Sequence, residues 1–190
     1  MAGQVSTNEF KAGLKVEVEG QPYTMITNEF VKPGKGQPFN RVKLKHLMTG
    51  RVIERTFKSG EKLGISDVEE TNMRMLYKEA NGVVFMDDVS FEQVTIPLSV
   101  IGEGECWLLE DQMYSIIVYN GTPINVEPPT FMELKIVETS PGIRGDTTGR
   151  VMKPATVETG AKVQIPIFVE EGEIVKFDTR TNEYVSRASK

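Results

Sequence analysis

The sequence predicts an all-β fold made of short strands. Three observations carry this prediction: apolar and charged residues alternate along much of the chain, Asn-Gly pairs stand between such segments, and long stretches with helical spacing are absent. The 190 residues include 17 glycines and 10 prolines, a content typical of many turns and many short elements. One short helical turn is expected at residues 97–101.

The first third of the chain predicts a small barrel of the SH3 type. Residues 14–18 alternate apolar and charged side chains, and residues 19–22 supply a turn. Residues 41–45 alternate again, Thr49-Gly50 turns the chain, and residues 51–57 return as a strand. A meander of this length fits a small SH3-like barrel.

The other two thirds predict further hairpins. Residues 73–78 and 83–86 flank Asn81-Gly82, and residues 114–119 run into Asn120-Gly121. Both residues of an Asn-Gly pair tolerate positive φ, which makes the pair a strong hairpin turn. In the last third, strands are expected at residues 131–137, 162–169, 174–178 and 183–186.

Two segments are candidate domain boundaries. Residues 127–130, Glu-Pro-Pro-Thr, are stiff and cannot continue a strand ladder, and the balance of charge changes sign near residues 63–67. The expected domains are therefore 1–64, 65–128 and 129–190. The apolar pattern of residues 94–100 recurs at 163–169, which raises the hypothesis of a duplicated domain. Each third is small for an independent core, so we expect neighbouring domains to pack together.

Charge is distributed unevenly along the chain. The net charge is −5, but the balance is +5 over residues 1–63, −10 over residues 64–128 and zero over residues 129–190. A basic first third beside an acidic middle third indicates separate domains with different neighbours, or else unevenly charged solvated surfaces.

Residues for catalysis or metal binding are scarce. The single histidine, His46, would have to serve any catalytic triad, and we expect it instead to be a partly buried strand residue or an RNA-facing ring. One histidine and one cysteine cannot supply a zinc site of the usual kind, and Cys106 beside Trp107 reads as an inert core thiol. We expect no enzyme activity, no metal and no cofactor.

The composition also bears on the compartment. No apolar run approaches the roughly 20 residues of a membrane helix, and the first ten residues do not resemble a secretory signal. A single cysteine excludes an intrachain disulfide, which suits a reducing compartment. We expect a cytoplasmic monomer without a membrane partner.

The segment with the clearest functional signal surrounds Lys35. Gly34 and Gly36 let the backbone turn tightly at this lysine, while Pro33 and Pro38 restrict the conformations of the loop. We therefore expect Lys35 to lie at a protruding tip. Between residues 31 and 62, nine basic residues face only two acidic ones. Strand alternation places three of them on one face, a stripe suited to a phosphate backbone: Arg41, Lys43 and Lys45.

Five segments resemble the elongation factor P family of bacterial translation factors. Residues 29–36 are similar to that family's modified-lysine loop, and the strands behind the loop, the family signature and the last strands are matched at residues 41–44, 54–58, 153–166 and 175–187. The resemblance covers the whole chain in the right order.

The resemblance implies a fold and a function. It implies three small β-barrel domains, one KOW/SH3-like and two OB-like, in an L-shaped arrangement similar to tRNA. It implies binding to the ribosome between the P and E sites, where such a factor promotes peptide-bond formation at stalled polyproline sequences. Lys35 matches the lysine that modifying enzymes extend, in many members with a β-lysyl group. The implied partners are the ribosome, P-site peptidyl-tRNA, rRNA, an E-site ribosomal protein and the lysine-modifying enzyme.

The resemblance also assigns site residues. Those expected to meet tRNA or rRNA are Lys32, Pro33, Gly34, Gly36, Gln37, Arg41, Lys43 and Lys45. Those expected beside the E-site codon are Gly145, Asp146, Thr147 and Thr148. Three rival hypotheses remain: a hydrolase using His46, a purely structural or scaffolding protein, and a general OB-fold RNA-binding protein or chaperone. The last of these would need exposed aromatic rings for base stacking.

Overall fold

The computed structural model describes residues 3–141 and 151–188. The described residues are mostly strands, which confirms the all-β prediction. The exceptions are the α-helix α1 (Leu98–Ile101), where the helical turn was expected, and the 3-10 helices η1 (Thr7–Glu9) and η2 (Gly102–Trp107). None of the described helices is long and apolar enough to cross a membrane.

The chain divides into two compact units. One consists of Met1–Thr71 and Ile116–Asn125, and the other of Asn72–Ser115 and Val126–Lys190. The division into domains 1–64, 65–128 and 129–190 stays a prediction.

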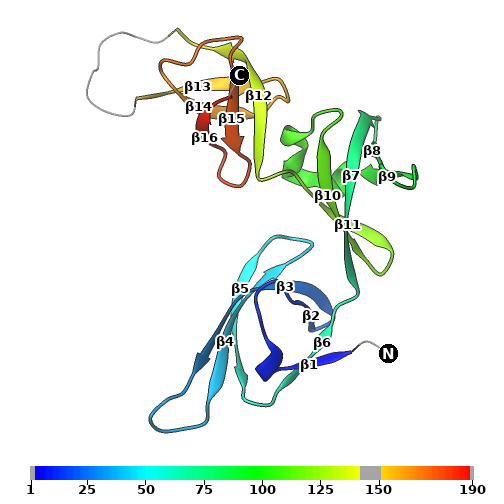
Figure 1. Cartoon of the computed structure of the whole chain (residues 1–190), viewed down its shortest axis with the longest axis vertical. Coiled ribbons are helices and arrows are strands. Elements are labelled where there is room, and N and C mark those ends of the chain that lie inside the picture. The colour runs from blue at the N-terminus through cyan, green and yellow to red at the C-terminus, as the bar shows by residue number, and fades with distance from the viewer. Residues whose placement is uncertain (1–2, 142–150, 189–190) are drawn as a thin grey trace. The chain divides into compact units, whose positions relative to one another are not determined.

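The first sheet has six strands in the order β1-β6-β2-β3-β4-β5 (Figure 1). Its strands are β1 (Gln4–Ser6), β2 (Lys15–Val18), β3 (Gln21–Val31), β4 (Phe39–His46), β5 (Val52–Lys58) and β6 (Lys62–Ile65). Alternate side chains of these strands point into one apolar core, which explains the alternation in the sequence. The buried members of this core are Val5, Phe10, Val16, Val18, Met25, Val42, Leu44 and Phe57.

The second sheet has five strands in the order β11-β10-β7-β8-β9. Its strands are β7 (Val68–Lys78), β8 (Gly82–Met86), β9 (Gln93–Pro97), β10 (Met113–Tyr119) and β11 (Thr122–Glu127). Asn120 and Gly121 both have positive φ, as predicted for a turn between β10 and β11.

The hairpin at Asn81-Gly82 forms, since β7 and β8 pair there, but positive φ is not its cause. Neither residue has positive φ, so that part of the prediction is wrong. This position needs glycine for a steric reason instead, because a Cβ here would lie 2.8 Å from the carbonyl oxygen of Ile96 and would clash with it.

The third sheet closes into a barrel in the order β12-β13-β14-β16-β15. Its strands are β12 (Phe131–Thr139), β13 (Met152–Val157), β14 (Lys162–Pro166), β15 (Ile174–Asp178) and β16 (Glu183–Arg187). The second sheet pairs its strands in the same way. In both sheets the first strand pairs with the second and the fourth, the second also pairs with the third, and the fourth also pairs with the fifth. The recurring apolar pattern falls on the third strand of each set, and β9 and β14 both end at a proline, which lacks the N–H that a ladder needs. A duplicated domain would have this arrangement.

Trp107, at the end of η2, joins the core of this barrel. The indole is 4% exposed, packs among the buried barrel residues and lies 6.4 Å from the Phe177 ring between centroids. The Tyr114 hydroxyl fixes its backbone by donating to the Trp107 carbonyl at 2.7 Å and accepting from the Leu109 N–H at 2.8 Å. Burial raises the pKa of Tyr114 to about 12, so the hydroxyl keeps its proton. The segment before β10 therefore packs into the C-terminal barrel.

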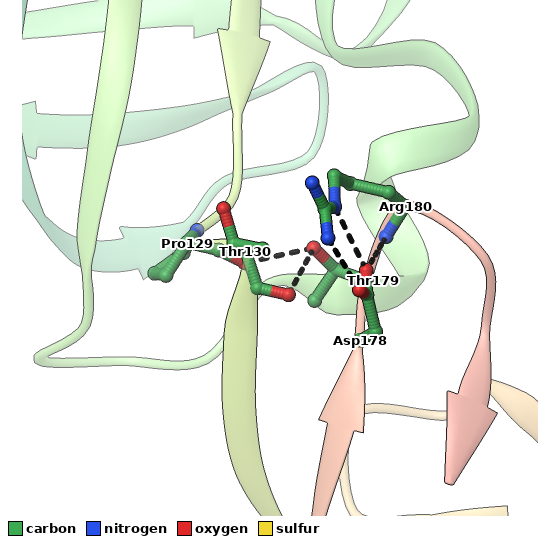
Figure 2. Close-up of polar contacts among 5 residues, drawn as sticks. All are labelled: Pro129, Thr130, Asp178, Thr179 and Arg180. Atoms are coloured by element: carbon green, nitrogen blue, oxygen red, sulfur yellow. Dashed lines mark hydrogen bonds and ion pairs between the residues drawn. The ribbon is translucent and has the colours of Figure 1, made fainter. Parts of the chain in front are cut away.

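The segment at residues 127–130 is fastened to the turn after β15 (Figure 2). The Thr179 hydroxyl donates to the Pro129 carbonyl at 2.7 Å, and the Thr179 N–H donates to the Thr130 carbonyl at 2.9 Å. Next to it, Arg180 forms a 2.6 Å ion pair with Asp178. Hydrogen bonds from Arg180 lower the pKa of Asp178 to about 2, so this carboxylate stays ionised at neutral pH.

Candidate functional site

Lys35 lies on the loop that closes the β3–β4 hairpin. Val31 pairs with Phe39 at the end of the ladder, so residues 32–38 form the loop, drawn in light blue in Figure 1. The Lys35 side chain is exposed. Gly36 has a φ of 109°, a conformation that residues with a Cβ rarely adopt, so the loop needs glycine there. The tip position predicted for Lys35 agrees with this geometry.

The base of the loop is attached to the chain that follows β5. Pro33 and Pro38 are half-buried, and the Pro38 carbonyl accepts a hydrogen bond of 3.2 Å from the Ser59 N–H, which follows β5. The loop is thus fixed at its base and exposed at its tip.

A buried cluster of amide groups lies beneath the loop. Asn40, two residues after Pro38, is 4% exposed, and its Nδ2 donates to Asn28 Oδ1 at 2.8 Å and, more weakly, to the Thr7 carbonyl at 3.5 Å. Asn28 Nδ2 donates in turn to the Phe10 carbonyl at 2.9 Å. These bonds tie β3, β4 and the N-terminal segment together at the root of the loop. Sequence reasoning missed the cluster, because only the β3–β4 register brings the two asparagines together.

Replacing Asn40 with alanine should destabilise the protein by about 1–3 kcal/mol. The change leaves the Asn28 Oδ1 and Thr7 carbonyl oxygens without this donor in a buried site, and unsatisfied buried groups cost that much. Urea denaturation followed by circular dichroism measures the effect. The matched control is Gln37→Ala, which removes the same amide group from an exposed loop position and should change stability by less than about 0.5 kcal/mol. Equal stability of the two variants would contradict this role for the cluster.

The three basic residues of β4 lie on the face opposite the core. Arg41 and Lys43 are exposed and Lys45 is half-buried, whereas Val42 and Leu44 between them are fully buried. The face that carries these charges adjoins the Lys35 loop along the same strand. The structure therefore brings the predicted loop residues and the predicted stripe together on one hairpin.

Carboxylates interrupt this basic face. Arg41 lies 3.7 Å from Glu29 on β3 and 3.8 Å from Glu54 on β5, and Glu54 also pairs with Lys43 in the β4–β5 register. These are long, solvent-exposed ion pairs, which contribute little to stability. They do reduce the positive potential of the face. The count of basic residues along the chain overlooked Glu29, because Glu29 becomes a neighbour of Arg41 only through strand pairing.

Phe30 was also missed. Its side chain is 58% exposed at the end of β3, next to the Lys35 loop. Alternation places Phe30 on the core side, where it pairs with Asn40, but the apolar core ends before this position. The loop therefore has an exposed aromatic ring beside it.

His46 is arranged as a structural residue. Its ring is half-buried against Tyr23, with 4.8 Å between centroids, and Nδ1 accepts hydrogen bonds from the Met48 N–H at 3.1 Å and the Thr49 N–H at 3.3 Å. A triad histidine needs a proton on Nδ1 to donate to its carboxylate partner. Nδ1 of His46 is occupied as the acceptor for two backbone N–H groups and faces no carboxylate in these hydrogen bonds, so His46 does not have the geometry of a triad base.

The remaining candidate residues add no reactive group. Cys106 is half-buried, and burial raises the pKa of its thiol, which keeps it protonated and unreactive. Within residues 3–141 and 151–188, no three His, Cys, Asp or Glu side chains gather as metal ligands would. Four predicted residues, Gly145, Asp146, Thr147 and Thr148, lie outside the described residues.

The C-terminal barrel lacks a stacking platform on its β13–β14 face. OB folds that bind single strands use the face centred on their second and third strands, which are β13 and β14 here. The outward side chains on these two strands are Met152, Pro154, Thr156, Lys162, Gln164 and Pro166. None is aromatic, which disfavours a general single-strand-binding role for this barrel.

Comparison with solved structures defines the class of fold. A eukaryotic-type translation initiation factor 5A from Methanococcus jannaschii superposes with a TM-score of 0.51, covering 64% of this chain and 90% of that chain at 23% identity. A translation initiation factor 5A family protein from Naegleria fowleri gives a TM-score of 0.51, covering 66% and 95% at 14% identity. At these identities the likeness shows the fold alone: this chain has the fold of these two proteins over about two thirds of its length.

Sequence relatives then give the family. The models for the elongation factor P KOW-like domain, OB domain and C-terminal domain match residues 6–63, 68–126 and 132–187. "Elongation factor P 2" of Protochlamydia amoebophila is 68% identical over 187 residues, 98% of each chain, and its counterpart in Chlamydia trachomatis is 58% identical over 188 residues. The chain belongs to the elongation factor P family and is a translation elongation factor.

Proposed function

We propose that this factor binds the ribosome between the P and E sites and promotes peptide-bond formation where polyproline sequences stall it. The observation that carries the proposal is the placement of Lys35, an exposed lysine at the tip of a hairpin that is fixed at its base and has basic residues behind it. The experiment is to translate a polyproline message with the native factor and with Lys35 variants.

The proposed action is positional. Proline attacks poorly because its amine is secondary and its ring fixes φ, so the reacting groups reach attack geometry rarely. A side chain that braces the CCA end of the P-site peptidyl-tRNA would raise the fraction of time spent in that geometry. This role needs a rigid support, a long reach and a cation near phosphates, and it needs no catalytic group on the factor. The factor is accordingly proposed to have no catalytic centre and no metal requirement.

A lysine-modifying enzyme is proposed to extend Lys35, most simply with a β-lysyl group. Such an extension lengthens the side chain and keeps a positive charge at its end. Lys35 is exposed, and a Cβ at Gly34 would meet no atom within 4 Å. The loop is therefore accessible for binding by a modifying enzyme. Lys32 and Gln37, also exposed on this loop, are proposed to contact tRNA or rRNA beside it.

The exposed charges of β4 should govern the salt dependence of ribosome binding. Changing Arg41 and Lys43 together to glutamate should weaken binding and reduce the slope of log affinity against log salt, by about 0.7–0.9 for each phosphate that the factor no longer neutralises. Filter binding of labelled factor to 70S ribosomes over a range of salt measures the slope.

The neighbouring carboxylates provide a control of opposite sign. Changing Glu29 and Glu54 together to glutamine removes the two acids beside Arg41, so binding should tighten and the slope should steepen. Both pairs of changes lie on exposed positions of the same sheet, so they perturb folding equally little. Identical salt slopes for the native factor and both double variants would show that this face does not meet RNA.

The other proposed partners follow the distribution of charge. The acidic middle of the chain suits a basic ribosomal protein near the E site better than RNA. Gly145, Asp146, Thr147 and Thr148 are proposed to lie beside the E-site codon, where short polar side chains can contact base edges.

A further inference from the structure

The loop between β8 and β9, residues 87–92, holds two apolar side chains in solvent (green in Figure 1). Val89 is 89% exposed and Phe91 is 71% exposed, the largest fractions among the large apolar side chains that the structure describes. Single exposed apolar side chains are common and need no explanation. Here two of them stand two positions apart on one short loop, and together they form what we call the 89/91 knob.

Hydrogen bonds within the loop fix the knob in place. Asp87 Oδ1 accepts from the Val89 N–H at 2.8 Å and from the Ser90 N–H at 2.7 Å. The Phe91 N–H donates to the Asp87 carbonyl at 2.9 Å, and the Asp87 N–H donates to the Glu92 carbonyl at 3.0 Å. The two apolar side chains are therefore presented by a built turn.

Arg74 on β7 braces the same loop from its side. Its Nε and Nη2 donate to the two carboxylate oxygens of Asp88, at 3.0 and 2.6 Å, and its Nη1 donates to the Asp111 carbonyl at 2.8 Å. A bidentate pair of this kind fixes orientation as well as distance. The knob thus stands on a support that is ordered before any partner arrives.

The backbone of Phe91 is the most unusual feature of the loop. Its φ is +59°, and no other aromatic among the described residues has a positive φ. Hairpin loops normally place glycine or asparagine in this conformation, because a bulky side chain is strained there. Neither burial nor backbone preference favours phenylalanine at this position. A residue that breaks a local folding rule while exposed to solvent points to a functional role.

The charges around the knob indicate the kind of partner. The loop and its brace carry four carboxylates, on Asp87, Asp88, Glu92 and Asp111, against the single guanidinium of Arg74. Nucleic acid would be repelled by this surface, whereas a basic protein would be attracted to it. An aromatic anchor ringed by charge is the usual centre of a protein–protein contact.

We propose that the 89/91 knob is a docking element that inserts Phe91 into an apolar pocket on a basic protein surface of the ribosome. The inference rests on the proposed ribosomal function, and it adds a second point of attachment, separate in sequence from the Lys35 loop. In this proposal the 89/91 knob increases the affinity of the factor for the ribosome, while Lys35 increases the rate of Pro-Pro bond formation.

Phe91→Asn tests the knob directly. Asparagine tolerates positive φ, so the variant should melt at the same temperature as the native protein or higher. Its affinity for 70S ribosomes carrying P-site tRNA should fall about tenfold or more, as for the loss of an anchor side chain. The rate of Pro-Pro bond formation at saturating factor should not change. The matched control is Phe168→Asn, which removes a 57% exposed ring after β14 and should leave the affinity unchanged.

A photoreactive phenylalanine analogue at position 91 identifies what the knob touches. Irradiation of the complex with 70S ribosomes should yield a cross-link to a basic ribosomal protein. A cross-link only to RNA, a cross-link to a second copy of this chain, no cross-link, or unchanged affinity of Phe91→Asn would each overturn the proposal. Failure of the knob proposal can be told apart from failure of the proposed function. The proposed function is tested by Lys35→Ala, which should lower the rate of Pro-Pro bond formation at saturating factor and leave the knob's contribution to ribosome affinity unchanged.

Discussion

Replacing Lys35 with alanine should abolish the stimulation of Pro-Pro bond formation while leaving the protein folded. The side chain is exposed at a loop tip and contributes nothing to a core, so stability should change by less than about 0.5 kcal/mol. Activity should nevertheless fall to the level without factor, because the extended cation is the only group proposed to reach the peptidyl-transfer region. A reconstituted translation assay with a polyproline message measures the rate.

Lys32→Ala is the matched control for this loss. Lys32 is an exposed lysine on the same loop, three residues from the tip, so its replacement removes the same charge from a position not proposed to be extended. The variant should bind somewhat more weakly and keep a rate at saturating factor close to native. If Lys32→Ala and Lys35→Ala lower the rate of Pro-Pro bond formation at saturating factor to the same extent, the loop acts only through its total charge.

Replacing Trp107 with alanine should destabilise the second compact unit by about 3–5 kcal/mol, the usual cost of truncating a large buried aromatic side chain. Trp107 is 4% exposed among the barrel core residues, and the Tyr114 hydroxyl donates a hydrogen bond to the Trp107 carbonyl. The surrounding strands belong to a closed barrel, which cannot collapse easily into the cavity left behind. Guanidinium denaturation followed by far-ultraviolet circular dichroism gives the free energy of unfolding.

Phe168→Ala is the control for truncation of an aromatic side chain outside the core. Phe168 follows β14 in the same barrel but is 57% exposed, and the Arg187 guanidinium lies over its ring, 5.1 Å from the centroid. Its truncation should cost about 1 kcal/mol or less. A destabilisation by Trp107→Ala no larger than this would mean that η2 does not form part of the barrel core.

Some of the strands that the sequence revealed alternate strictly. Buried and exposed side chains alternate along residues 131–137 of β12 and residues 40–44 of β4, so the pattern is visible without knowledge of the neighbouring strands. β3 was missed because the ladder shifts register between Met25 and Thr27, which breaks the alternation midway. β13 was missed because Lys153 points inward, where it is 7% exposed and donates to the Ser140 carbonyl at 2.9 Å, and a proline follows it.

The candidate site was predictable only where the chemistry is local. The Lys35 loop is encoded by glycines and prolines within seven residues, so sequence alone places its tip. The ion pairs of Arg41, the Asn28–Asn40 hydrogen bond and the exposure of Phe30 and Phe91 depend on strand register and on where the core ends. Both are tertiary properties, and no pattern along one strand reports them.

The rate of Pro-Pro bond formation at saturating Lys35→Arg factor tests the central claim most directly. Arginine keeps the positive charge at the tip, but a guanidinium does not accept the acyl extension and differs from an ammonium in shape and hydration. If the extended reach of Lys35 positions the peptidyl-tRNA, the arginine variant should bind ribosomes nearly as well as the native factor and stimulate the reaction hardly more than Lys35→Ala. A native rate with arginine at position 35 would contradict the account, because charge at the tip would then suffice without extension.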